Sequence, residues 1–139
     1  MAELFKVAVV DDDPRLRKLI VEELTDEGVT PLPCETGQKL LDLLQSESVD
    51  LILLDLMMPE MDGFLCLEEL VKRSIQVPVI VVTALNDEVK HQKVHDLGAV
   101  DYILKPDLFE RLPELLNHHR PRPRNLHDQG LPAESEESF

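Results

Sequence analysis

The sequence lacks the features that mark membrane and secreted proteins. It has no continuous apolar run near the roughly 18 residues that a membrane-spanning helix needs. Its first residues carry neither the basic region nor the long apolar segment of a signal peptide. With 43% hydrophobic residues in 139 positions, the chain can bury a core of its own. We therefore expect a cytoplasmic, globular domain without membrane insertion.

Cysteine and basic residues are also scarce. Cys34 and Cys66 fit no zinc-binding or Cys-x-x-Cys spacing, so two reduced, partly buried thiols are expected. The sequence has 14 Lys and Arg residues against 28 Asp and Glu residues, which gives a formal net charge of −14. Binding to nucleic-acid phosphates needs a basic surface, so this charge argues against direct nucleic-acid contact. It suits a bound cation or a basic partner.

Residues 49–63 contain the stretch that says most about the fold and the functional site. Leu51 to Leu54 form an apolar run too short for an ordinary helix, as in a strand buried on both faces of a parallel sheet. Asp55 ends that run, at the rim where open α/β folds place their ligands. Pro59 and Gly63 then favour an irregular loop. On this stretch alone, an Asp that only caps the following turn remains an alternative.

Further apolar runs alternate with helical patterns along the chain. The strands are expected at residues 6–10, 29–34, 51–54, 77–82 and 100–104. Pro31 and Pro33 cannot donate to a ladder, which assigns the second strand to a sheet edge. The pattern predicts an α/β fold with a doubly wound, five-stranded parallel sheet in the flavodoxin-like order 2-1-3-4-5.

Helix signals follow each strand. Asp13 followed by Pro14 predicts the start of the first helix, and Gly28 its end. A fifth helix after residue 108 is less clear, because Pro113 removes an internal hydrogen bond. We expect the domain to cover residues 1–119 and the polar, Pro-rich residues 120–139 to form a disordered tail.

The predicted strand order brings polar side chains together at one rim. They are Asp11, Asp12, Asp55, Thr83 and Lys105. Three carboxylates repel one another unless a cation joins them, and ligands that are all oxygen favour Mg²⁺. Together with an ammonium and a hydroxyl, they suit phosphoryl transfer, in which a carboxylate can be the nucleophile.

Four motifs in this order resemble the receiver domain of two-component response regulators. They are Val9-Val10-Asp11-Asp12, Asp55 with residues 58–63, Val82-Thr83-Ala84, and residues 101–106. The resemblance covers roughly residues 6–120. It implies a phosphorelay protein that catalyses only its own phosphorylation and dephosphorylation.

The resemblance also implies roles around the phosphoacceptor. Asp55 would accept a phosphoryl group from a histidine kinase or a histidine phosphotransfer protein. Asp12, Asp55 and the Met57 carbonyl would bind Mg²⁺, with Asp11 reaching the ion through water. Lys105 would pair with the phosphoryl group.

Further implied roles concern the switch. Thr83 and the backbone N–H groups of Ala84 and Met57 would bind the phosphoryl oxygens. Tyr102 occupies the place of the switch aromatic, whose ring turns inward when Thr83 moves toward the phosphoryl group. The Lys105–Pro106 peptide would be cis.

Most response regulators carry an effector domain after the receiver, whereas about twenty residues follow Arg120 here. The output is therefore expected to be contact with a downstream protein or a further phosphotransfer, unless the sequence is part of a longer regulator. Pro113 puts dimerisation through the last helix in doubt, so a monomer or weak dimer is expected.

Two other functions fit parts of the pattern. Asp11-Asp12-Asp13 satisfies the Asp-x-Asp motif of haloacid-dehalogenase-type phosphatases, although the later paired acidic motif is missing. A phosphorylation-independent pseudo-receiver would be expected to lack an acid or the lysine. His91 and His95 have a spacing that can bind metal, but the Glu of a His-Glu-x-x-His motif is missing, and a solvated helix face is the better account of them.

Overall fold

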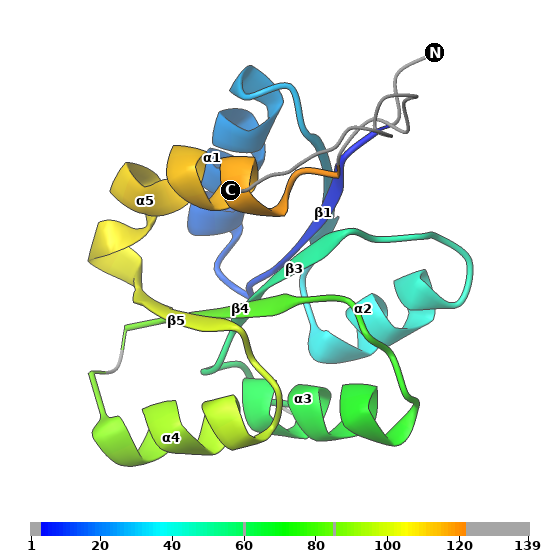
Figure 1. Ribbon diagram of the computed structural model, residues 1–139, viewed down its shortest axis with the longest axis vertical. Helices are drawn as coiled ribbons and strands as arrows, with labels where there is room; N and C mark the ends of the chain where they lie inside the picture. Colours follow the sequence, from blue (N-terminus) through cyan, green and yellow to red (C-terminus); the bar gives the residue numbers. More distant parts are fainter. Residues whose placement is uncertain (1–3, 60, 85, 122–139) are drawn as a thin grey trace, which may run out of the picture.

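The computed structural model describes residues 4–59, 61–84 and 86–121, and it shows a parallel sheet between two layers of helices (Figure 1). The strands are β1 (Lys6–Val10), β2 (Thr30–Cys34), β3 (Leu51–Asp55), β4 (Val79–Thr83) and β5 (Asp101–Leu104). The helices are α1 (Pro14–Asp26), α2 (Gly37–Leu44), α3 (Gly63–Lys72), α4 (Glu88–Asp96) and α5 (Leu108–His119), with a short 3-10 helix, η1 (Lys105–Asp107), before α5.

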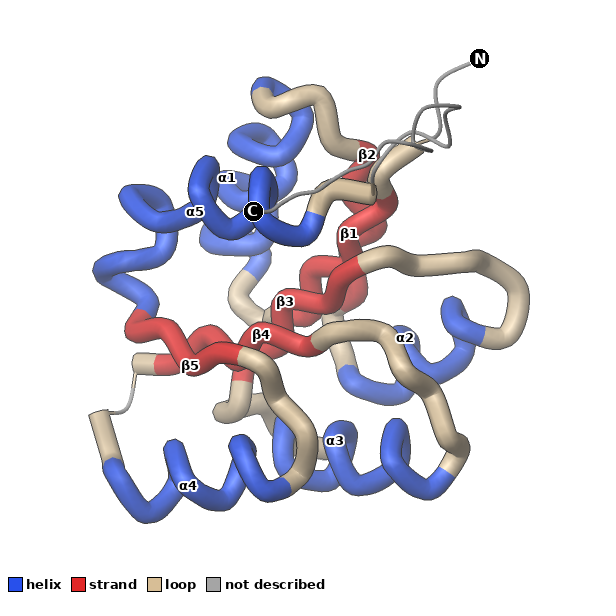
Figure 2. Tube along the Cα trace, in the orientation of Figure 1, coloured by secondary structure: helices blue, strands red, loops and turns tan. Residues whose placement is uncertain are grey.

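The sheet has the order β2-β1-β3-β4-β5, with every neighbouring pair parallel. This confirms the predicted fold class and strand order. Figure 2 shows α1 and α5 on one side of the sheet and α2, α3 and α4 on the other. The sequence predicts this arrangement, because right-handed crossovers place helices on both faces.

Two apolar cores follow from the alternation of side chains along each strand. On β1, Val7 and Val9 pack toward α1 and α5, whereas Ala8 and Val10 pack toward α2, α3 and α4. The same alternation holds in the central strand, where Leu51 to Leu54 are at most 2% exposed. The apolar run at this strand is therefore explained by burial on both faces.

Strand β2 lies at an edge, as its prolines predict. Pro31 and Pro33 stand opposite Val7 and Val9, and the N–H of Thr30 donates to the Phe5 carbonyl at 2.8 Å. Since alternate residues of a strand point their backbone nitrogens to opposite sides, both proline nitrogens face the open edge. The prolines therefore remove no hydrogen bond between β1 and β2.

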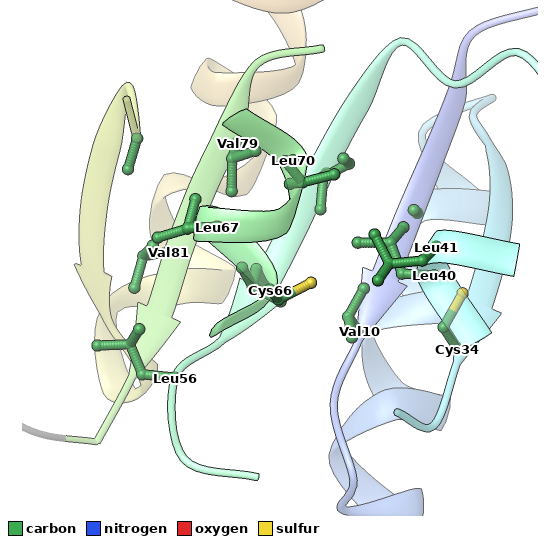
Figure 3. Packing of buried hydrophobic residues seen from close by; sticks show 14 of the residues in the cluster. Val10, Cys34, Leu40, Leu41, Leu56, Cys66, Leu67, Leu70, Val79 and Val81 are labelled. Carbon is green, nitrogen blue, oxygen red and sulfur yellow. The ribbon is translucent and has the colours of Figure 1, made fainter. Parts of the chain in front are cut away.

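The two cysteines are buried in the core beneath α2 and α3 (Figure 3). Burial raises the pKa of the Cys34 thiol to about 11 and that of the Cys66 thiol to about 12. Such thiols stay protonated at neutral pH and react slowly. The predicted reduced cysteines are confirmed as core residues.

Helix α5 continues through Pro113, which the sequence made doubtful. It begins at Leu108, five residues before the proline, so Pro113 cannot donate to the Phe109 carbonyl. Leu112 and Leu116 are at most 1% exposed in the core beneath α1 and α5, and their burial offsets this loss. Within the described part of the chain, no helix has the length and apolarity to cross a membrane. The predicted tail lies outside the described residues from 122 onward.

The start of α3 packs directly on the end of β3, and this contact leads to a prediction. A Cβ added at Gly63 would lie 2.7 Å from both the Asp55 carbonyl oxygen and the Leu56 Cα, and neither backbone atom can turn aside. Gly63→Ala should therefore destabilise the protein by about 1–3 kcal/mol, measured by urea unfolding.

Gly37→Ala is the matched control for this prediction. Its added Cβ would meet mainly the flexible side chain of Met61, with Sδ at 3.1 Å, which can move aside. Equal losses of stability in the two variants would contradict the contact proposed for Gly63.

Candidate functional site

The carboxyl ends of four strands bring the predicted polar residues to one rim. Asp55 and Thr83 are the last residues of β3 and β4, while Asp11 and Lys105 directly follow β1 and β5. The pairing of Val10 with Leu54, and of Thr83 with Leu104, sets these strand ends level. The predicted convergence at the rim is confirmed.

Asp11, Asp12 and Asp55 form an acidic cluster. One carboxylate oxygen from each lies within 4.8 Å of the other two, and of the described residues only this group has three side chains placed to hold a metal ion. Asp11 and Asp55 are each 2% exposed, whereas Asp12 is exposed. This donor set fits a hard cation that keeps water on its open side.

Lys105 provides the positive charge within the cluster. Its Nζ lies 3.4 Å from Oδ2 of Asp55 and 3.4 Å from Oδ2 of Asp11. Burial on its own would lower the pKa of Lys105, but the two carboxylates raise it above its usual value. The ammonium therefore stays charged.

One ammonium does not compensate the crowded acids. Burial, and then the charge of Asp11, raise the pKa of Asp55 to about 6, although Lys105 and a backbone hydrogen bond lower it. That hydrogen bond comes from the N–H of Met57, 3.2 Å from Oδ1 of Asp55. The site therefore resists full ionisation unless a further cation binds.

Helix α1 holds the loop that carries two of the acids. Asp13 caps the helix by accepting from the Arg15 N–H at 3.0 Å, as predicted, and its own N–H donates to Oδ1 of Asp11 at 2.8 Å. Arg17 Nη1 donates to the Asp11 carbonyl at 2.7 Å. Arg17 was not predicted from the sequence; the available signal was an arginine one turn into the helix, facing back toward the strand end.

The other predicted residues surround the cluster at different depths. Thr83 is fully buried, Ala84 is exposed, and the Met57 side chain is 54% exposed. Tyr102 lies away from the acids, on β5 beside α4, where its ring stacks on His91. His91 and His95 are both on the exposed face of α4, as the solvated-face interpretation predicts.

The prediction of a cis Lys105–Pro106 peptide is wrong. The described residues contain no cis peptide bond. Pro106 instead lies within η1, where its fixed φ and missing N–H suit the first turn of a helix. This short turn positions Lys105 without a cis bond.

Comparison with known proteins agrees with the geometry of the site. The family profile "Response regulator receiver domain" matches residues 7–117. The chain is 37% identical over 120 residues to the probable C4-dicarboxylate response regulator DctR of Bacillus subtilis, a match covering 84% of this chain and 52% of DctR. It is 39% identical over 100 residues to response regulator RR06 of Streptococcus pneumoniae, covering 72% and 46% of the two chains. The chain thus spans about half the length of these curated relatives.

Solved structures show the same relationship. Chemotaxis protein CheY4 of Vibrio cholerae superposes with a TM-score of 0.78 at 27% identity, covering 84% of this chain and 99% of CheY4. The receiver domain of Francisella response regulator 1452 superposes with a TM-score of 0.75 at 32% identity, covering 81% of this chain and 93% of that domain. The chain belongs to the response regulator receiver domain family, whose members are signalling modules rather than classical enzymes.

Proposed function

We propose that Asp55 accepts a phosphoryl group from the phosphohistidine of a histidine kinase or a histidine phosphotransfer protein, in a reaction that requires Mg²⁺. The observation that carries this proposal is the buried Asp55 carboxylate, held between two further acids and Lys105. A carboxylate in this setting is a nucleophile with charge-neutralising groups beside it.

The transfer exchanges one bond to phosphorus for another. An Asp55 oxygen attacks the phosphorus, the P–N bond breaks, and the donor imidazole leaves with the electron pair and takes up a proton. Asp55 must be ionised to attack, and Lys105 at 3.4 Å favours that form. Lys105 then pairs with the transferred group.

The metal would be held by Asp12, Asp55 and the Met57 carbonyl, with Asp11 contributing through water. When bound, Mg²⁺ would neutralise negative charge on these acids and on the phosphoryl oxygens. The oxygen-only donor set and the open side at Asp12 support this assignment. The residues present thus fit the ion.

The signal leaves the site through Thr83 and Tyr102. The Thr83 hydroxyl and the N–H groups of Ala84 and Met57 bind the phosphoryl oxygens, and the shift of Thr83 lets the Tyr102 ring turn inward. A downstream protein reads the altered surface of α4, β5 and α5. The receiver acts as a monomer or weak dimer.

The first test of this proposal is the site of labelling. Incubation with Mg²⁺ and labelled acetyl phosphate should label the protein once, and Asp55→Asn should abolish the label, because Asp55 occupies the place of the phosphoacceptor at the end of β3. Asp11 is equally buried and equally close to Lys105, so it is the acid that this experiment must distinguish from Asp55. The label is followed by gel autoradiography and located by peptide mapping. Loss of labelling in Asp11→Asn with normal labelling in Asp55→Asn would instead indicate the dehalogenase-type chemistry.

The second test concerns the metal. Saturating Mg²⁺ should raise the melting temperature, since a ligand at 100 times its Kd stabilises the folded state by about 2.7 kcal/mol. Asp12→Ala should remove this response without unfolding the protein, because Asp12 is exposed. Asp26→Ala, at the far end of α1, is the matched control and should respond like the wild type. A full response in Asp12→Ala would mean that Mg²⁺ binds elsewhere on this acidic surface.

A further inference from the structure

Tyr102 is held against α4 by a stacked imidazole. Its ring and that of His91 have centroids 4.4 Å apart and planes inclined by only 10°. Tyr102 is partly buried and packs against the core on the α4 side of the sheet, while His91 is exposed. His91 therefore covers one face of the Tyr102 ring from the solvent side.

The same turn of α4 holds the Tyr102 hydroxyl. Burial raises the pKa of Tyr102, and a hydrogen bond with the Asp87 backbone opposes that rise. Asp87 caps α4, and its carbonyl accepts the His91 N–H at 2.9 Å. The ring face and the hydroxyl of Tyr102 thus both contact the first turn of α4.

This turn is directly linked to the site at the rim. Strand β4 ends at Thr83, and α4 is capped four residues later at Asp87. A shift of Thr83 toward Asp55 therefore acts on a short connection that leads to both contacts of Tyr102. Inward rotation of the ring requires it to separate from His91.

We propose that His91 is a positioning residue for the switch: it holds Tyr102 in its partly exposed place and so opposes the phosphorylated arrangement. This inference rests on the proposed function of Asp55 and Tyr102. Stacked aromatic pairs shift an equilibrium by about two- to ten-fold beyond the effect of burial alone. Loss of the stack should therefore make the switch respond at a lower concentration of a phosphoryl analogue.

The composition of the chain supplies a direct readout. It contains one tyrosine and no tryptophan, so tyrosine emission reports Tyr102 alone. The experiment titrates beryllofluoride, a phosphoryl analogue, in saturating Mg²⁺ and follows this emission. Wild type is compared with His91→Ala and with His91→Phe, which keeps an aromatic ring for stacking. The control is His95→Ala, which removes a second histidine from the groove that His91 and Tyr102 line.

We expect His91→Ala to bind beryllofluoride about two- to ten-fold more tightly than wild type. His91→Phe and His95→Ala should both reach half of the emission change at the same beryllofluoride concentration as the wild type. In the absence of the analogue, acrylamide should quench Tyr102 more strongly in His91→Ala than in the wild type.

Two results would overturn the inference. One is a His91→Ala titration whose midpoint lies at the same beryllofluoride concentration as in the wild type, or at a higher one. The other is a His91→Phe variant that behaves like His91→Ala. Failure of the proposed function would give a different result. The Tyr102 emission of the wild type and of all three His variants would then respond to beryllofluoride no more than that of Asp55→Asn.

Discussion

Repulsion among three carboxylates is the constraint on which the site depends. Two unit charges about 4 Å apart repel by about 1 kcal/mol in water and by about 4 kcal/mol at an effective dielectric constant near 20. The oxygens of Asp11, Asp12 and Asp55 lie within 4.8 Å of one another, and two of these residues are 2% exposed. Lys105 opposes part of this repulsion at 3.4 Å from Asp11 and Asp55. The remainder favours the binding of a cation among the three acids.

The fold keeps the acids together against this repulsion. The level ends of β1 and β3 fix Asp11 and Asp55, while α1 holds the Asp11 loop through the 2.7 Å hydrogen bond from Arg17. At β3, the close approach of Gly63 leaves no room for a side chain beside the Asp55 backbone. These contacts come from core-packed elements on both faces of the sheet, so the acids cannot separate without disturbing the core.

The sequence predicted the parts of this account that depend on periodicity and strand order. The five apolar runs, the edge position that Pro31 and Pro33 give the second strand, and right-handed crossovers were enough to predict the sheet, its order and the meeting of the acids. The missed features depend on surface geometry that periodicity does not encode. Leu19 and Val71, for example, are apolar yet are 52% and 58% exposed, and among the described elements none covers them. The Arg17 hydrogen bond and the stack of His91 on Tyr102 depend on side-chain rotamers. The predicted cis peptide was wrong because it came from the resemblance alone, and a short 3-10 turn positions Lys105 instead.

The most direct test of this electrostatic account is the pKa of Asp55, measured from the carboxyl carbon chemical shift by NMR with and without Mg²⁺. Without metal, the account predicts a pKa of about 6, above the ordinary 3.8. The folded state then favours the protonated acid, so stability that is present below pH 3.8 is lost as the pH rises through about 6. With saturating Mg²⁺, the pKa should fall below its metal-free value. A metal-free pKa near 3.8 that Mg²⁺ leaves unchanged would contradict the account.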